Sequence, residues 1–201
     1  MILVYHLVGT AMEIYKVHMG SWIYPEAAIV RLGGVPLFTG FMYAAVGSYM
    51  ARVIRIFDMR FSDYPPRRWT ILLAIAIYVN FFTHHVLPDL RLALFAATVV
   101  LFRRVRIWFT VDAVPRWMPF LMAAILTSFF LWIAENVGTR TGTWLYPGQT
   151  VWHWVSWAKM GSWYLLLMIS FVLISLVTPL RPPDPAAAPD RTDPTPATDP
   201  T

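Results

Sequence analysis

"EIYKVHMGSWIYPE" at residues 13–26 and "ENVGTRTGTWLYPG" at residues 135–148 share one skeleton. In both stretches a Glu is followed by six residues and then by Gly, Ser or Thr, Trp, an aliphatic residue, Tyr and Pro. Every matched pair is 122 residues apart (135 against 13), and no gap is needed. Six matched positions in register do not arise readily by chance, so we expect the chain to contain an internal repeat.

The composition around this repeat is that of a membrane protein. Of the 201 residues 58% are apolar and only 13% are charged, and the mean hydropathy is +0.55, which is too apolar for a soluble domain of this length. A helix needs roughly 20 apolar residues to cross about 30 Å of hydrocarbon. Six runs predict an all-α, polytopic transmembrane helix bundle of about six spans: 2–19, 35–57, 69–85, 89–109, 117–137 and 157–178.

The basic residues predict how these spans are oriented. Arginines gather in the loops after the second and the fourth span, which the positive-inside rule assigns to the cytoplasm. They are Arg52, Arg55, Arg60, Arg67, Arg68, Arg103, Arg104, Arg106 and Arg116. We therefore expect both termini in the cytoplasm and both motif copies at the outer face. Topology and contact with lipid headgroups also explain the net charge of +5, so nucleic acid is not an expected partner.

The two ends of the chain differ from the rest. Residues 1–180 are expected to form one transmembrane domain. The remaining residues, 181–201, are rich in proline and hold no large apolar group after residue 181, which predicts a disordered cytoplasmic tail. The first span carries His6 and Glu13 and has little apolar surplus for its own insertion. We therefore expect further hydrophobic helices to precede it in the natural protein.

The repeated glutamates are the strongest candidates for function. An ionisable side chain in a span costs roughly 2.5–3.5 kcal/mol on insertion scales and normally faces the protein interior or a wet cavity. With the predicted orientation the two copies are parallel and related by a pseudo-two-fold axis along the membrane normal. We predict that Glu13 and Glu135 share one site, covered by the two Trp-x-Tyr-Pro loops. The alternative is that these carboxylates only join helices by hydrogen bonds.

Other polar and aromatic residues are expected at the same end of the bundle. The candidate acids and bases are Glu13, Glu135, His84 and His6. The candidate ligand-binding residues are Trp22, Tyr24, Asn80, His85, Asn136, Trp144, Tyr146 and Lys159. The Trp and Tyr residues have a simpler explanation too, because aromatic residues are enriched where a span meets the membrane surface.

Several classes of site are excluded or weakly supported. The chain has no cysteine, which rules out disulfides, thiolate nucleophiles and cysteine-ligated metals. It also lacks the nucleophile-elbow, P-loop and dinucleotide patterns. Adjacent His84 and His85 would point about 100° apart on a helix, and no His-x-x-x-His or Glu-x-x-His pair occurs. We predict neither a metal nor another cofactor.

Several stretches resemble a bacterial integral-membrane family, the domain-of-unknown-function family eight-seventeen. They are "EIYKVHMGSWIYPE", "GVPLFTGFMYAAVGSY", "YVNFFTHHVLPDLR", "WIAENVGT", "TWLYP" and "KMGSW". The resemblance covers roughly residues 5–176 and implies a multi-pass protein of the bacterial cytoplasmic (inner) membrane, with additional helices before residue 6. It implies no activity.

A weaker resemblance points to membrane carotenoid hydratases and heterodimeric lycopene cyclases, through the Glu-x6-Gly-x-Trp-x-Tyr pattern and a following "GVP". The cyclases' Pro-x-Glu-Glu element is replaced here by "PLFT", residues 36–39, which removes the carboxylates needed for cyclisation. This resemblance implies an isoprenoid ligand, bound or modified by acid-base chemistry.

Two other functions compete with an isoprenoid site. A proton-coupled transporter would carry its polar residues across the whole bundle, and a non-catalytic scaffold would need none of them. Membrane lipids are expected partners in every case. The sequence leaves the oligomeric state open.

Overall fold

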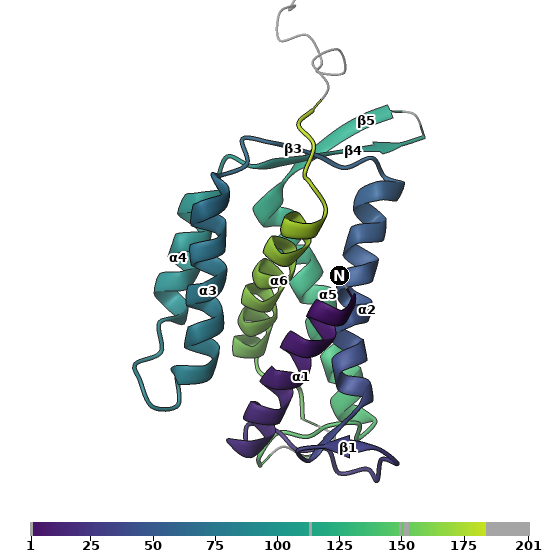
Figure 1. The fold of residues 1–201 in the computed structure, drawn as a ribbon. Coiled ribbons are helices and arrows are strands. Elements are labelled where there is room, and N and C mark those ends of the chain that lie inside the picture. The colour runs from purple at the N-terminus through teal and green to yellow at the C-terminus, as the bar shows by residue number, and fades with distance from the viewer. Residues whose placement is uncertain (1, 113, 149, 151–152, 184–201) are drawn as a thin grey trace, which may run out of the picture.

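The computed structural model describes residues 2–112, 114–148, 150 and 153–183, and within them the chain forms six helices and two small sheets (Figure 1). The helices are α1 (Ile2–His18), α2 (Phe38–Ile56), α3 (Arg67–Thr83), α4 (Arg91–Phe102), α5 (Phe120–Arg140) and α6 (Trp157–Val177). The strands are β1 (Arg31–Leu32), β2 (Val35–Pro36), β3 (Arg60–Ser62), β4 (Arg106–Val111) and β5 (Val114–Pro119). Each of the six predicted spans contains one helix.

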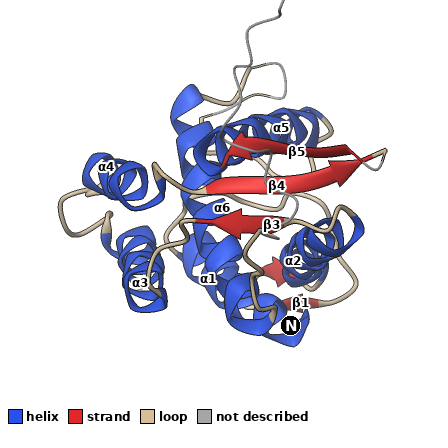
Figure 2. Cartoon of the chain, turned by 90° about the horizontal axis from the view of Figure 1, so that it is seen from above, coloured by secondary structure: helices blue, strands red, loops and turns tan. Residues whose placement is uncertain are grey.

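The helices form pairs around α6. Figures 1 and 2 show α3 and α4 side by side on one flank, α1 and α2 on the other, and α6 between them, with α5 against α6. Helix α6 also contacts α2 and α3, and most of its central residues are buried. The N-terminal half of the chain therefore packs onto a C-terminal helix, and α6 organises the core.

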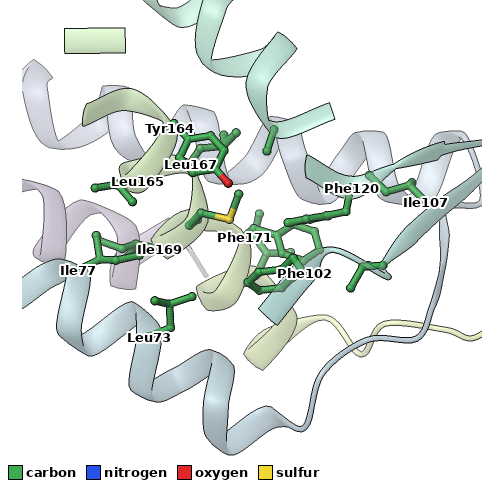
Figure 3. Close-up of a cluster of buried hydrophobic side chains, with 14 of the residues drawn as sticks. Leu73, Ile77, Phe102, Ile107, Phe120, Tyr164, Leu165, Leu167, Ile169 and Phe171 are labelled. Atoms are coloured by element: carbon green, nitrogen blue, oxygen red, sulfur yellow. The ribbon is translucent and has the colours of Figure 1, made fainter. Parts of the chain in front are cut away.

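The two ends of the bundle differ. We call the end where α1 and α5 finish the motif end, because the loops at 19–37 and 141–148 lie there (Figure 1). The opposite end, the sheet end, is covered by the antiparallel sheet of β3, β4 and β5. Beneath the sheet, Phe120 stacks on Phe102 and meets Phe171, with ring centroids 4.9 and 4.7 Å apart (Figure 3).

The prediction of an all-helical chain missed this sheet. The predicted span at 89–109 ends as a helix at Phe102, and residues 106–111 instead form β4. The stretch "RIWFTV" is rich in aromatic and β-branched residues, which favour a strand. Pro115 and Pro119 then prevent a helix before residue 120, and they lie on β5, an edge strand of the sheet, where proline is tolerated.

The helices differ in their ability to cross a membrane. Helices α5 and α6, with 21 residues each, are long and apolar enough to span the hydrocarbon, and α4 is apolar but has only 12 residues. Helices α1 and α3 have 17 residues. The described part of the chain is thus mostly helical with two clear candidate spans. The tail predicted to be disordered lies, beyond residue 183, outside the described residues.

Candidate functional site

The two motif loops pair with each other at the motif end. The backbone N–H of Ile23 donates to the carbonyl of Leu145 at 2.9 Å, and the N–H of Leu145 donates back to Ile23 at 3.0 Å. These are the middle residues of the two Trp-x-Tyr segments, 122 positions apart. Gly20 and Gly142 precede them with φ of 67° and 75°, a left-handed conformation that only glycine adopts freely. The two copies therefore leave their helices in the same way and meet at equivalent residues.

Glu13 lies on α1 beneath its own loop and is 3% exposed. The Trp22 indole N–H donates to Oε2 at 2.9 Å and the Tyr24 hydroxyl donates to the same oxygen at 2.7 Å. The Tyr43 hydroxyl, from α2, donates to Oε1 at 2.8 Å. Both carboxyl oxygens thus have donors, as a buried acid requires.

Glu135 occupies the equivalent position on α5 and is also 3% exposed. The Tyr146 hydroxyl donates to Oε1 and the Trp163 indole N–H, from α6, donates to Oε2. The Trp144 indole lies beside this carboxyl group, with its six-membered ring over Gly138, where a Cβ would approach the ring to 2.4 Å. In both copies the loop tyrosine and tryptophan therefore lie against the glutamate, and in the second copy Trp163 supplies a further indole donor.

Both glutamates line one cavity of about 440 Å³ at the motif end. Its walls come from α1, α2, α3, α5, α6 and the two motif loops. Ten of the twelve residues singled out from the sequence line it: Glu13, Trp22, Tyr24, Asn80, His84, His85, Glu135, Trp144, Tyr146 and Lys159. Distant segments of the chain thus bring the polar residues of the motif end together.

Two of the predicted residues lie outside the lining of this cavity. His6 is between α1 and α2, where its ring meets Phe41 at a centroid distance of 4.4 Å and its Nδ1 is buried without a hydrogen bond. Asn136 is buried behind Glu135. Its amide donates to the Trp132 carbonyl at 2.7 Å and accepts from the Val155 N–H at 2.8 Å, which fastens the segment before α6 to α5. Their geometry is that of helix-packing residues.

Basic residues form one side of the cavity. The Lys16 ammonium lies 3.1 Å from His85 Nε2 and 4.6 Å from the centre of the Phe81 ring. The Lys159 ammonium lies 3.8 Å from the centre of the Tyr146 ring and 5.6 Å from that of Trp22. Because ammonium groups bind aromatic faces, these rings hold both lysines at the cavity wall.

The segment between α3 and α4 completes this side. The pKa of His84 and that of His85 lie below the ordinary value, first because burial removes water and then because the Lys16 charge opposes protonation. Asp89 bonds to Arg91 at 2.5 Å and accepts from Asn80 at 3.3 Å. Burial raises the pKa of Asp89, but these hydrogen bonds outweigh it and hold the pKa below its ordinary value. The neutral histidines leave Lys16, Lys159 and Arg91 as the cationic groups of the cavity.

Among the lining residues that were not singled out from the sequence are Lys16, Tyr43 and Trp163. A signal existed for two of them. The chain contains only two lysines, and "MGSW" occurs at residues 19–22 and again at 160–163, ending each time in a tryptophan that donates to a motif glutamate. Tyr43 has no such signal, because its contact with Glu13 depends on how α2 crosses α1.

No metal centre is formed by the described residues. Among them no three His, Asp or Glu side chains come together as ligands, and the adjacent rings of His84 and His85 lie 4.0 Å apart. The described donors at the site are instead indoles, phenols, ammonium groups and a guanidinium.

The cavity adjoins an apolar groove that extends toward the sheet end. The groove has a volume of about 640 Å³ and is lined by side chains of α2, α5, α6 and the sheet, among them Tyr49, Met50 and Phe130. Val46 and Leu131 line both the cavity and the groove. A polar compartment at the motif end thus continues into an apolar one.

Comparison with known proteins identifies the family of this chain and structures with a similar fold. A family model described as "Protein of unknown function (DUF817)" matches residues 1–171, which confirms the family predicted from the motifs. The chain is also similar to the uncharacterized protein YoaT of Bacillus subtilis (strain 168), with 39% identity over 188 residues that cover 93% of this chain and 71% of the relative.

Two solved structures resemble the fold. One is the mycobacterial Insig homolog MvINS from Mycobacterium vanbaalenii, with a TM-score of 0.58 and 15% identity over 86% of this chain and 91% of that chain. The other is a cross-linked MvINS trimer, with a TM-score of 0.58 and 14% identity over 87% and 92% of the two chains. At these identities the likeness concerns the fold alone.

Proposed function

The chain belongs to the family described as Protein of unknown function (DUF817), and from this premise we propose that it is a multi-pass membrane protein that binds an isoprenoid-type lipid. The polar end of the lipid occupies the cavity at the motif end, and its chain lies in the apolar groove. One observation carries the proposal: the polar cavity and the groove share Val46 and Leu131 and so accommodate one elongated amphipathic molecule.

The apolar lining of the groove favours a lipid, rather than a transported ion, as the ligand. A proton path would continue across the bundle through ionisable or hydrated side chains. Below the cavity the described lining is dominated by apolar side chains such as Val53, Phe61 and Met168. Removing an apolar chain from water stabilises the complex by about 25 cal/mol per Å² of buried surface, although a ligand drawn from the bilayer gains less.

The hydrogen bonds of Glu13 support binding without turnover. An acid that protonates a polyene must present its O–H to the substrate. The donors from Trp22, Tyr24 and Tyr43 occupy both oxygens of Glu13, and the indole N–H has no capacity to accept. His6, the base considered for such chemistry, does not line the cavity. We therefore assign the glutamates to holding the walls of the lipid site.

The membrane arrangement is part of the same proposal. In it the helix bundle is embedded in the bilayer, the motif end faces outward, and two parallel half-units, α1–α2 and α5–α6, each bring one glutamate to the site. Paired Ile23 and Leu145, at equivalent positions of the two copies, support the repeat. The arginines at the sheet end support the orientation.

Mass spectrometry of bound lipid tests the proposal. The full-length protein is purified gently from its native membrane, and its organic extract is compared with that of the variant Ala45→Trp, whose new side chain fills the groove, and of Ala76→Trp, a matched change on an exposed face of α3 outside the groove. We expect an isoprenoid lipid to be enriched in the wild type and in Ala76→Trp and to be lost from Ala45→Trp. Bulk phospholipid alone in all three samples would refute the proposal.

A double variant, Glu13→Gln with Glu135→Gln, separates binding from turnover. The same lipid, chemically unchanged, is expected in the wild type and in reduced amount in the variant. A chemically different lipid in the variant would instead identify the glutamates as catalytic.

A further inference from the structure

We propose that Lys16 and Lys159 form a subsite for a phosphoryl group at the motif end of the cavity. This inference rests on the proposed lipid-binding function and specifies the head group: a phosphate ester held between two ammonium groups. It concerns charge, whereas the lipid proposal concerns the apolar groove, so the two can fail separately.

The distribution of basic residues first indicates the subsite. The chain has fourteen arginines, mostly in loops and at helix ends, and only two lysines, both of which line the cavity. Lys16 lies on α1 and Lys159 on α6, so the fold brings them together from distant parts of the sequence. Such a pair is stabilised when an anion lies between its members.

Neither lysine has an anionic side chain in direct contact among the described residues. Lys16 is 2% exposed, and its one hydrogen-bond partner among the described residues is the neutral His85. Lys159 is half-buried and lies over two aromatic rings, and the Glu135 charge attracts it without a direct ion pair. Neither forms a salt bridge within 4.0 Å in the part of the chain that the structure describes. Burying an unpaired charge is costly, and a bound anion would remove that cost.

The glutamates do not fill this role, although both line the same cavity. Their oxygens accept hydrogen bonds from indole and hydroxyl groups. The Tyr146 ring intervenes on the Glu135 side, since its hydroxyl bonds to that carboxyl group while Lys159 lies over its face. The acidic groups are therefore satisfied by neutral donors, and the ammonium groups face the cavity.

Two neighbouring features favour a phosphoryl group at this place. Helix α6 begins at Trp157, and Ser156, Ala158 and Ser162 around its first turn line the cavity. The start of a helix carries free N–H groups and a partial positive charge, both of which favour anions. The Arg91 guanidinium lines the cavity as well, tied to Asp89. A phosphate ester has several acceptor oxygens and can bind such convergent donors simultaneously.

Binding of paired probes tests the subsite. The full-length protein in nanodiscs is titrated with farnesyl monophosphate, with farnesol and with inorganic phosphate, and bound probe is quantified. The variants are Lys16→Met, Lys159→Met and Lys159→Arg, and Arg140→Met is the control because it removes a charge at the motif end outside the cavity. Farnesol binding by each variant establishes that it is folded.

We expect the wild type to bind the phosphate ester at least about tenfold more tightly than the alcohol, and each Lys→Met change to weaken the ester about tenfold while leaving the alcohol unchanged. Lys159→Arg and Arg140→Met should keep the preference. Equal binding of ester and alcohol, with the groove still occupied, would overturn the subsite and leave the lipid proposal standing. Failure of both lipid probes would overturn both. Binding of inorganic phosphate without the alcohol would support the phosphoryl site and identify free phosphate as its ligand.

Discussion

The two copies of the motif each bury a glutamate, but the hydrogen-bond donors around the two carboxyl groups differ. In each copy the tyrosine of the loop donates to the glutamate eleven residues before it. In the first copy the loop tryptophan, Trp22, also donates to its glutamate. In the second, the Trp144 ring lies over Gly138 beside Glu135, and a further indole hydrogen bond comes from Trp163 on α6. The hydrogen bond between glutamate and tyrosine is thus common to both copies.

One substitution between the copies explains much of this asymmetry. Gly138 is 122 residues after Lys16 and so occupies the equivalent position on α5. A side chain at 138 would collide with Trp144, whereas Lys16 places an ammonium group at the cavity. The first copy therefore contributes a charged side chain to the cavity, and the second contributes close packing of an indole ring against its helix. Two similar stretches of sequence thus line an asymmetric site.

The largest expected effect separates the two glutamates. Glu13→Leu leaves three donors without their acceptor, one of them buried and two part-buried, and Glu135→Leu leaves two part-buried donors. At roughly 1–3 kcal/mol for each unsatisfied group, we expect losses in the free energy of unfolding of about 4 and about 3 kcal/mol, and smaller losses for the isosteric Gln variants. Thermal unfolding in one detergent measures the order. A larger loss for Glu135→Leu would show that the hydrogen bonds to the two acids are not comparable.

Cross-linking the two loops tests whether the copies pair as described. Ile23 and Leu145 exchange two backbone hydrogen bonds, a pairing that places Cα atoms about 5.5 Å apart, within the range of a disulfide. The chain has no cysteine, so Ile23→Cys with Leu145→Cys should form one unambiguous bond on oxidation. We expect it to stabilise the protein by about 2–4 kcal/mol. Val30→Cys with Leu145→Cys is the control, and equal cross-linking of both pairs would contradict the pairing.

Gly138→Ala tests whether the Trp144 ring packs closely against α5 at residue 138. The added Cβ would approach the Trp144 ring to 2.4 Å, so the ring must move. Overpacking and the gain in helix propensity act in opposite directions, and we expect a net loss of about 1–2 kcal/mol in the free energy of unfolding. Combining it with Trp144→Ala should remove the clash, so that the double variant loses less than the sum of the single changes. Additive losses would show that the ring is not held over residue 138.

The smallest expected effect concerns acid. The pKa of His84 and that of His85 are lower in the folded protein than the ordinary value of 6.5, so the unfolded chain binds more protons. Stability should therefore fall as the pH drops below about 6.5 and level off below the folded pKa values. Unfolding temperatures between pH 8 and 5 measure this slope, which His84→Gln with His85→Gln should flatten. His18→Gln, an exposed change outside the cavity, should not.

Much of the fold was predictable because its signals are local. Apolar runs located all six helices, although the sheet end was missed where "RIWFTV" interrupts the apolar pattern. Polar residues inside these runs identified six residues of the cavity, because an ionisable group in a span must face the interior, and the motif loops supplied the other four. His6 satisfied the same rule and still lies elsewhere, between α1 and α2. A rule about burial indicates that a residue faces inward but not which neighbour it meets.

The sequence alone thus determined the helices, the repeat of the motif and the end of the bundle at which the motif lies, since hydropathy and spacing are properties of contiguous residues. The tertiary structure decided which donors reach Glu13 and Glu135, because Tyr43 and Trp163 come from helices whose crossing no local pattern fixes. It also decided that the two lysines, 143 residues apart (159 against 16), face one cavity. Contacts between distant segments arise from packing around α6, and the polar site exists only once that packing has formed.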